Sequence, residues 1–310
     1  MLGSELQAGE TAVEPTSIGD AIASTVYVPA DVYSYEELAA IYNMARVDYI
    51  VPMPMNAKRM SDYVREYDVD LSASLLSLND EREPTGVVMV GLRDERAWIT
   101  RLGVIPERRG RKVGQGLMEA SIQSACMCGA CRVQLEVIQG NEPAHRLFLK
   151  LGFYDVRELL VVRRAPGPLD LAAVSTEAHV AEMVSLDKQT IAACLMEHAS
   201  ACGSPVAWTE ESASLRHMTN LIGLALTLDT GETGWIVCQA LPFQLTHMIV
   251  NPGASPAMIE ALFLHLHRRY PLHDAKIENL PPGSSLWEII QRMGYLEAFR
   301  RVEMYLDLPG

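Results

Sequence analysis

The pattern of hydrophobic and polar residues predicts secondary structure most clearly over one stretch of the chain, residues 97–153. An apolar run at 98–105 is typical of a buried strand, and Pro106 ends it. A basic, glycine-containing loop follows at 108–114, and apolar residues then recur at helical spacing to about Met127. The pattern predicts a strand, a turn and a helix in that order.

The same stretch continues with a second strand and a second helix. The run Val-Gln-Leu-Glu-Val-Ile at 133–138 is rich in β-branched residues, as strands are. A shorter helical pattern then closes on Gly152 and Phe153. Residues 97–153 are therefore predicted to form a strand, turn, helix, strand, helix unit.

Shorter elements precede this unit. The run 24–28 predicts a first strand. Ser34 stands before an acidic first turn and predicts a helix to about Met44, and Asn56 predicts a second helix to about Tyr67. A turn rich in Asp, Glu and Pro between apolar runs at 70–78 and 85–92, and the run 159–162, add a predicted hairpin and one more strand.

The two halves of the chain share a repeated spacing. In each half a proline ends an apolar run, a glutamate stands inside a later apolar run, and a glycine-aromatic pair follows that glutamate at the same distance. The matched positions are Pro106 and Pro252, Glu136 and Glu278, and Gly152 and Gly294. Such self-similarity indicates duplication of one fold.

Length and the breaker residues around 165–168 predict the domain organisation. A chain of 310 residues exceeds the usual size of one domain. We expect a mobile leader at 1–20, a first domain at 21–165, a linker at 166–173 and a second domain at 174–310.

Charge and hydropathy exclude several classes of partner. The formal net charge of −13 argues against binding to nucleic acid, because phosphate contacts need clustered Lys and Arg. No apolar run is long enough to cross a bilayer, and the first residues lack the layout of a secretory signal. We expect a cytoplasmic protein with no membrane partner, and a homodimer stays open.

Three cysteines, Cys126, Cys128 and Cys131, are spaced like metal ligands at the end of a helical pattern. A zinc site needs four ligands, and no Cys or His pair stands at a fitting distance to complete one. We therefore predict no metal, and free thiols that are buried or half-buried.

The loop after Pro106 has the composition of an anion site. A turn from a strand into a helix presents unpaired backbone N–H groups, and the helix dipole favours negative charge there. Glycines let the backbone approach a ligand closely. The loop carries Arg108, Arg109, Arg111 and Lys112 with Gly110 and Gly114, so we expect it to hold phosphate rather than to be a plain solvated loop.

The residues around this turn resemble two motifs of the GNAT acetyltransferase family. Motif A resembles Val104-x-Pro106-x-x-Arg109-Gly110-x-x-Val113-Gly114-x-x-Leu117, and motif B resembles Asn141-x-x-Ala144-x-x-Leu147-Phe148-x-Lys150-x-Gly152-Phe153. The resemblance covers about residues 24–165 and is weak in the second half. It implies an α/β (α+β) fold with a mixed central sheet of the acyl-CoA N-acyltransferase type, which the repeat predicts to be duplicated.

The resemblance also implies a cofactor site for acetyl-CoA. The turn would hold the pyrophosphate, the backbone around Val104 would pair with the pantetheine arm, and Asn141 would contact the cofactor near the second strand. The predicted cofactor-binding residues are Leu102, Val104, Arg109, Gly110, Arg111, Lys112, Val113, Gly114, Gln115, Asn141, Ala144 and Phe148.

The chain departs from the family pattern at two positions. When Val104, Pro106 and Leu117 are aligned, Lys112 stands where the first glycine of the family signature usually lies. The family signature, Q/R-x-x-G-x-G/A, is matched literally one position later, by Arg111-x-x-Gly114-x-Gly116. We prefer the first alignment, because it keeps Pro106 and Leu117 at their family positions. Phe148 stands where many members have a tyrosine proposed as general acid, so that role is absent.

Glu136 is the predicted catalytic base. The resemblance implies this role, because a glutamate in a similar Leu-Glu-Val strand followed by Asn acts on the amine in the ribosomal-protein alanine acetyltransferases. An alkylammonium must lose a proton before it can attack a thioester, and a carboxylate can take that proton through water. The alternative is a strand glutamate that faces solvent or pairs with an arginine.

These observations predict an acetyl-CoA-dependent N-acetyltransferase that transfers acetyl directly to a primary amine of a small molecule or a protein N-terminus. The second half would be a degenerate copy, because its turn at 252–257 has no Lys or Arg. An acidic excess at 31–70 favours a cationic acceptor. Tyr49, Met53 and Met55 lie in the stretch that usually covers the acceptor site in this family, and packing in the core is the alternative for them. The alternative is a non-catalytic acyl-CoA-binding sensor or assembly module.

Overall fold

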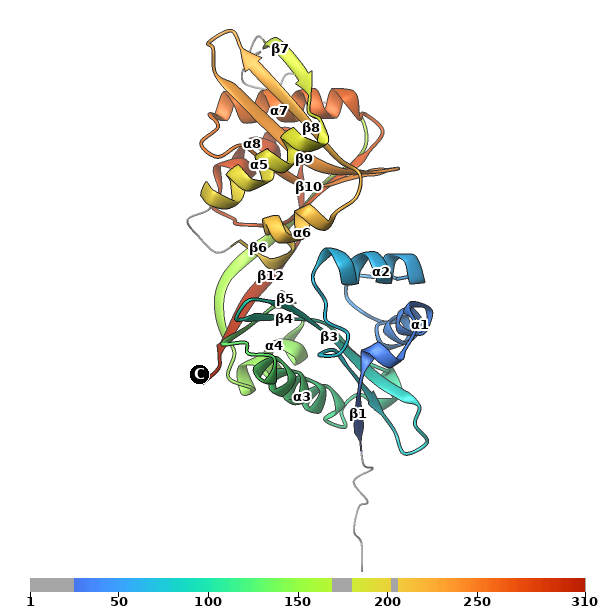
Figure 1. Cartoon of the computed structure of the whole chain (residues 1–310). Helices are drawn as coiled ribbons and strands as arrows, with labels where there is room; N and C mark the ends of the chain where they lie inside the picture. Colours follow the sequence, from blue (N-terminus) through green and yellow to red (C-terminus); the bar gives the residue numbers. More distant parts are fainter. Residues whose placement is uncertain (1–24, 169–179, 202–205, 310) are drawn as a thin grey trace, which may run out of the picture.

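The computed structural model describes residues 25–168, 180–201 and 206–309. The predicted leader at 1–20 and most of the predicted linker, from 169 onward, lie outside the described residues. Figure 1 shows two lobes, one from each half of the chain, joined by two long strands, β6 and β12.

All the strands of the described residues belong to one mixed sheet of twelve strands, in the order β1-β2-β3-β4-β5-β12-β6-β11-β10-β9-β8-β7. The first half supplies β1 (Val26–Pro29), β2 (Leu75–Leu78), β3 (Pro84–Arg93), β4 (Arg96–Val104), β5 (Arg132–Ile138) and β6 (Tyr154–Arg164). The second half supplies β7 (Val180–Ser185), β8 (Leu221–Leu228), β9 (Thr233–Leu241), β10 (Gln244–Val250), β11 (Asp274–Leu280) and β12 (Leu296–Asp307).

The last strand of each half is exchanged with the other half. Strand β12 pairs with β5 of the first half from Arg301 opposite Ile138 to Asp307 opposite Arg132. Strand β6 pairs with β11 of the second half, and β6 and β12 pair with each other at the centre of the sheet. The sheet therefore runs without interruption across the predicted domain boundary at 165.

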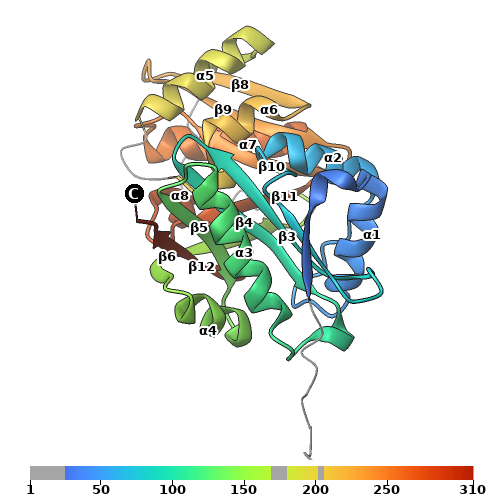
Figure 2. The same ribbon diagram turned by 60° about the horizontal axis from the view of Figure 1, so that its bottom comes forward.

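Helices cover both faces of the first half. Helices α1 (Tyr35–Ala45) and α2 (Ala57–Glu66) pack with Met89 and Trp98 on one face. Helices α3 (Val113–Met127) and α4 (Glu142–Lys150) pack with Ile99 and Leu135 on the other, and Figure 2 shows α3 lying along β3 and β4. Strands β3, β4 and β5 are buried on both sides, which explains their nearly continuous apolar runs.

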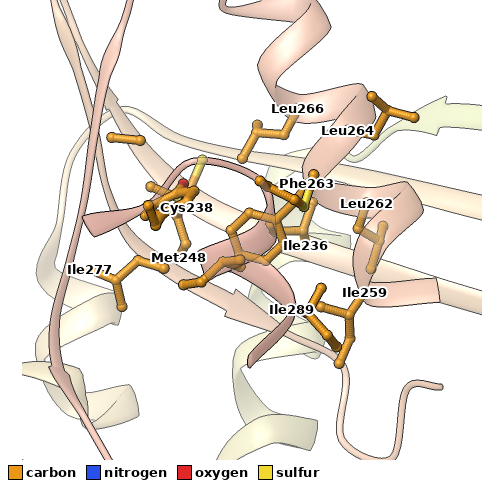
Figure 3. Close-up of a cluster of buried hydrophobic side chains, with 14 of the residues drawn as sticks. Ile236, Cys238, Met248, Ile259, Leu262, Phe263, Leu264, Leu266, Ile277 and Ile289 are labelled. Carbon is orange, nitrogen blue, oxygen red and sulfur yellow. The ribbon is translucent and has the colours of Figure 1, made fainter. Parts of the chain in front are cut away.

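The second half repeats this layering. Helices α7 (Pro256–Arg269) and α8 (Ser285–Arg292) cover one face, where Phe263 and Ile289 pack against Ile236, Met248 and Ile277 of the sheet (Figure 3). Helices α5 (Lys188–Ala201) and α6 (Ser212–His217) cover the other face. Short 3₁₀ turns lie at Ala30–Val32, Pro106–Arg108 and Trp208–Glu210.

The predicted helix starts are confirmed. Ser34 accepts a hydrogen bond from the N–H of Glu37, and the Glu37 carboxylate accepts one from the N–H of Ser34, so the two form a capping box. The side chain of Asn56 accepts from the N–H of Arg59 at the start of α2. These caps are local, which is why the sequence was sufficient to place them.

The first hairpin strand is shorter than the apolar pattern at 70–78 predicts. The carboxylate of Asp70 accepts from the N–H groups of Ser72 and Ala73 at 2.8 and 3.0 Å and fixes a turn, so the strand begins only at Leu75.

The prediction for the three clustered cysteines is wrong in its burial. Cys126, Cys128 and Cys131 are free thiols, as expected, but all three are exposed at the end of α3 and in the turn that follows. The helical pattern ends at these residues, so no further turn covers them. Two other free cysteines, Cys194 and Cys238, are buried.

Candidate active site

The repeated halves each contain a parallel pair of strands that separates. Strands β4 and β5 pair only from Arg96 to Trp98, and β10 and β11 pair only at Gln244 and Leu245. In each pair the earlier strand then makes a bulge, with Arg101 and His247 at left-handed φ of 56° and 52°. The two bulged residues stand at the same distance before Pro106 and Pro252. The duplication predicted from spacing thus extends to backbone conformation.

A cavity of about 150 Å³ lies in the gap between β4 and β5. Its walls come from both strands, from α4, from the segment between α1 and α2, and from the second half. The lining residues are Arg46, Tyr49, Met53, Tyr63, Tyr67, Trp98, Ile99, Thr100, Arg101, Leu102, Leu135, Glu136, Val137, Ile138, Asn141, Ala144, Phe148, Thr209, Glu278 and Arg301. The predicted base and four of the predicted cofactor residues therefore meet at one cavity.

The Glu136 side chain faces this cavity and makes no ion pair with any described residue. Its Oε2 accepts a hydrogen bond of 2.7 Å from the indole Nε1 of Trp98, whereas its Oε1 is buried without a hydrogen-bond partner. Burial raises the pKa of Glu136 to about 7, although the Trp98 hydrogen bond and Arg301 act in the opposite direction. The carboxylate is thus poised to change protonation near neutral pH, which suits a general base.

The turn before α3 leaves backbone donors open. Helix α3 starts without a side-chain cap, and within the described residues no partner accepts from the N–H groups of Val113, Gly114 or Gln115. Gly110 and Lys112 have positive φ of 75° and 63°, so the chain turns sharply into the helix. Unpaired N–H groups at a helix N-terminus and the helix dipole favour the binding of an anion.

Lys112 adopts the left-handed conformation that glycine takes without strain. This supports the alignment register in which Lys112 replaces the first glycine of the signature. Gly116, the last glycine of the alternative register, has a different explanation. A Cβ there would lie 1.8 Å from the Tyr27 hydroxyl, so the close packing of Tyr27 on α3 requires glycine.

The cationic side chains of the turn do not all point the same way. Arg109 donates from Nε to the carbonyl of Val104 at 3.0 Å and from Nη2 to the carbonyl of Ala45 at 3.3 Å. Arg109 thereby ties the turn to β4 and α1, while Arg111 and Lys112 are exposed and make no ion pair with a described residue. Gln115 is held by Lys150, whose Nζ donates to its side-chain oxygen at 2.8 Å.

The predicted motif B residues lie in α4 and in the turns on either side of it, after the end of β5. Asn141 caps α4, with its side chain accepting from the N–H of Ala144 at 3.4 Å, and both residues line the cavity. Phe148 is buried and packs against Phe153, with ring centroids 6.0 Å apart. On the opposite side, Leu102 reaches the cavity from β4.

Comparison with known proteins fits this geometry. The model of the acetyltransferase (GNAT) family matches residues 38–153. Residues 38–153 belong to the GNAT acetyltransferase family. The matched segment contains the basic turn, both separating strands and Glu136, and the family uses acetyl-CoA. No curated protein sequence matches the chain.

Solved structures resemble the chain over nearly its whole length. A GCN5-related N-acetyltransferase from Sphaerobacter thermophilus has 15% identity and a TM-score of 0.63, with 92% of this chain and 96% of that chain covered. A tandem GNAT protein from the clavulanic acid biosynthesis pathway has 14% identity and a TM-score of 0.63, with 93% and 100% covered. At these identities the likeness shows the fold, a mixed sheet of the GNAT type.

The second half also lines the cavity between β4 and β5, through residues that the sequence alone did not assign to a site. Glu278 and Thr209 line it, and so does Arg301, which the exchanged strand β12 brings beside β5. Arg301 donates to Glu278 at 2.6 Å and to the side chain of Asn279 at 2.9 Å. Only the strand exchange places Arg301 here, and no sequence signal predicts that exchange.

Glu278, which the repeat matches to Glu136, has a different environment. Burial alone would raise its pKa, but Arg301 and Lys276 hold the pKa of Glu278 well below its ordinary value. Lys276 and Arg301 each form an ion pair with it. Glu278 is therefore a permanently ionised partner of arginine and lysine, while Glu136 titrates.

No second anion site opens in the turn of the second half. The Glu232 carboxylate there accepts hydrogen bonds from the N–H and the hydroxyl of Ser255, at 3.0 and 2.7 Å, at the start of α7. Ser255 in turn caps the helix by accepting from the N–H of Met258. A protein carboxylate thus lies where the corresponding turn of the GNAT domain leaves its donors open.

Two further observations concern metals and membranes. Within residues 25–168, 180–201 and 206–309, no three His, Cys, Asp or Glu side chains are grouped so that they could hold a metal ion. Among the described helices, none has the length and apolar character needed to cross a membrane.

Proposed function

We propose that this protein is an acetyl-CoA-dependent N-acetyltransferase that transfers acetyl directly to a primary amine. The observation that carries the proposal is the position of Glu136, a buried carboxylate with a pKa near 7, in the gap between the two separating strands. The open N-terminus of α3 lies beside the end of β4, since a Cβ on Gly114 would lie 3.4 Å from Val104 Cγ2. A cofactor arm and an amine can therefore meet at a group able to accept a proton.

The parts of the site have separate roles in this proposal. The N–H groups of Val113, Gly114 and Gln115, with Arg111 and Lys112 nearby, would hold the pyrophosphate. Beyond Trp98, the edge of β4 that faces β5 pairs with no described strand, so the pantetheine arm would lie along this edge near Leu102 and Val104. The carbonyls of these two residues already accept hydrogen bonds from Arg46 and Arg109. When bound, acetyl-CoA supplies the acetyl group as a thioester.

Glu136 would take the proton that an ammonium must lose before it attacks. Its unpartnered Oε1 can accept that proton directly or through a water. Direct transfer is supported by the cavity lining, in which no cysteine occurs among the described residues, so no thiol is placed to form an acyl-enzyme.

A general acid is not required for the leaving thiol. Phe148 cannot donate a proton, and the Tyr63 phenol, which also lines the cavity, has its pKa raised to about 12 by burial. A thiol has an ordinary pKa of about 8.5, so the thiolate leaves without protonation by a phenol.

The second half is proposed to be a degenerate copy that walls the acceptor side of the cavity. The Glu232 carboxylate supports this, because it puts negative charge on the N-cap residue Ser255 of α7, where a phosphate would be repelled. We also propose that the chain divides into domains at 21–165 and 174–310 and that it forms a homodimer.

The test is a thiol-release assay with purified full-length protein, acetyl-CoA and a broad panel of primary amines and N-terminal peptides. We expect acceptor-dependent release with at least one amine, and mass spectrometry should show a gain of one acetyl group on it. Tight CoA binding with no release under any acceptor would contradict the proposal and favour the sensor or assembly module instead.

A further inference from the structure

Arg101 is a half-buried cation that lines the cavity, where Glu278 acts on it electrostatically without forming an ion pair. Its Nη1 lies 3.5 Å from the Tyr42 hydroxyl and 3.5 Å from the Met53 sulfur, and its guanidinium lies 4.5 Å from the centre of the Tyr63 ring. Its Nε is buried with no hydrogen-bond partner, and it forms no ion pair with a described residue. A buried unpaired charge is costly, so such sites normally receive a partner.

From this arrangement we propose that the acceptor is an amine that also carries a carboxylate, and that Arg101 binds the carboxylate while Glu136 serves the amine. The inference rests on the proposed function, because it names the substrate class of the same cavity. It makes Arg101 a specificity-determining residue that the family motifs do not include.

The repeated half provides an internal comparison. His247 occupies the position of Arg101 in the second bulge, with nearly the same left-handed φ. His247 is satisfied by the protein itself: its Nδ1 lies 3.2 Å from the Glu210 carboxylate, and its Nε2 lies 3.2 Å from the Tyr67 hydroxyl. In the second half the bulged residue His247 therefore contacts a carboxylate of the protein. In the first half Arg101 forms no ion pair with a described residue, and it lines a cavity that can accept a ligand.

The charges that line the cavity also favour an acceptor with a carboxylate. Of its three arginines, Arg301 is paired with Glu278, but Arg46 and Arg101 make no ion pair with a described residue. Arg46 donates to the carbonyl of Leu102 at 3.1 Å and lies over the Tyr49 ring. Because Glu136 is only partly ionised at neutral pH, the lining carries net positive charge, which an acceptor with a carboxylate would balance.

This proposal differs from the expectation of a cationic acceptor. The acidic side chains between 31 and 70 that suggested it do not line the cavity. Glu37 is used in a helix cap, Asp68 pairs with Arg93, and Asp70 fixes a turn. Their excess reflects local structure rather than recognition of a substrate.

A carboxylate fits better than a phosphate at this position. Guanidinium and carboxylate groups match as planar, two-point partners. The cavity is small, about 150 Å³, and Tyr42, Met53 and Tyr63 already surround the guanidinium, which favours a flat anion on a compact acceptor.

The experiment compares matched acceptors with the full-length protein and acetyl-CoA. Amino acids are tested against their primary amides and against amines of the same skeleton that lack the carboxylate; amino-alcohol phosphates form a third arm. We expect kcat/KM for the best amino acid to exceed that of its amide by about 10-fold or more, because only the acid can form the two-point contact.

Arg101→Gln should remove this discrimination. It should lower kcat/KM for the amino acid by about 10-fold or more, mainly through KM, and change that of the amide by about 2-fold or less. Arg101→Lys should recover part of the loss, since it keeps the charge but not the planar fork. Arg292→Gln, which removes an exposed arginine on α8, is the matched control and should keep the full preference.

Equal kcat/KM for acids and amides in the unaltered protein, or equal losses for both in Arg101→Gln, would overturn the inference, and so would a preference for the phosphates. Binding is measured separately by thermal shift and calorimetry with CoA present. Selective binding of amino acids that Arg101→Gln abolishes would support the carboxylate site even if no amine were acetylated. In that case only the proposed function would fail.

Discussion

Two glutamates in matching positions of the repeat have opposite acid–base properties. Glu136 is buried with a single neutral donor, Trp98, and its pKa is raised to about 7. Glu278 is equally enclosed but is paired with Arg301 and Lys276, which hold its pKa well below the ordinary value. Neighbouring charges, not position in the strand, decide which of the two can exchange protons near neutral pH.

The raised pKa gives a signed prediction for the rate. A base works only when deprotonated, so kcat/KM should rise with pH through about 7 and level off above it. Glu136→Gln should lower the rate by roughly 10²–10⁴ and remove this limb of the profile. The measurement is thiol release between pH 5.5 and 9. An unaltered rate and profile in the variant would remove Glu136 from the role of base.

The same variant carries a control for folding. The pKa of Glu136 is higher in the folded protein than the ordinary 4.5, so its contribution to stability is fully present below about 4.5 and is lost as pH rises through about 7. Glu136→Gln removes the ionised carboxylate. Its Tm at pH 8 should therefore equal or exceed that of the unaltered protein, which separates loss of catalysis from loss of structure.

At the scale of elements, one connection distinguishes the two halves. The turn between β4 and α3 leaves three backbone N–H groups open and carries exposed cations, whereas the turn between β10 and α7 is closed by the Glu232 carboxylate on Ser255. Both follow a bulged strand and a proline. The difference lies in what fills the helix N-terminus, so one acetyl-CoA should bind per chain.

Removing the turn's charges should weaken cofactor binding selectively. The triple substitution of Arg108, Arg111 and Lys112 by Ala should raise the KM for acetyl-CoA by about 10- to 100-fold, more at low than at high salt, with kcat at saturation nearly kept. Lys188, Arg268 and Arg292 are exposed cations of the second half. Replacing these three by Ala matches the charge change and should leave the acetyl-CoA KM unaltered. Equal effects of the two triple variants would argue against binding at the turn.

At the scale of the whole molecule, the halves depend on each other. Strand β12 completes the first half beside β5, and β6 completes the second half beside β11. Polar contacts add to this. Arg93 pairs with Asp68 and Glu211 and donates to the Trp208 carbonyl, and the rings of Trp98 and Trp208 stack with centroids 5.9 Å apart.

The exchange predicts that neither half is stable alone. Residues 1–168 expressed by themselves would leave β5 without its neighbour and the apolar face of β6 without its partners, so we expect aggregation or loss of CoA binding. Co-expression with residues 169–310 should restore a soluble complex. The readout is solubility and CoA binding of each half and of the pair. A soluble, CoA-binding first half would show that β12 is not needed.

Local chemistry explains what the sequence predicted well. Helix caps at Ser34 and Asn56, the basic turn at 108–114 and the repeat at Pro106 and Pro252 all depend on residues close together in the chain. Their hydrogen bonds and backbone conformations form within a few residues, so short patterns specify them. For the same reason the placement of Glu136 in a strand that follows the turn and helix could be predicted.

Tertiary structure decided the environment of those residues. The burial of Glu136, the unpaired charge of Arg101 and the arrival of Arg301 beside the cavity depend on strands from both halves that are far apart in the sequence. A pKa or an ion pair reflects every charge and every covering atom within several ångströms, whichever part of the chain supplies it. By itself the sequence determined the elements and the basic turn, and only the exchanged sheet determined which charges face the cavity.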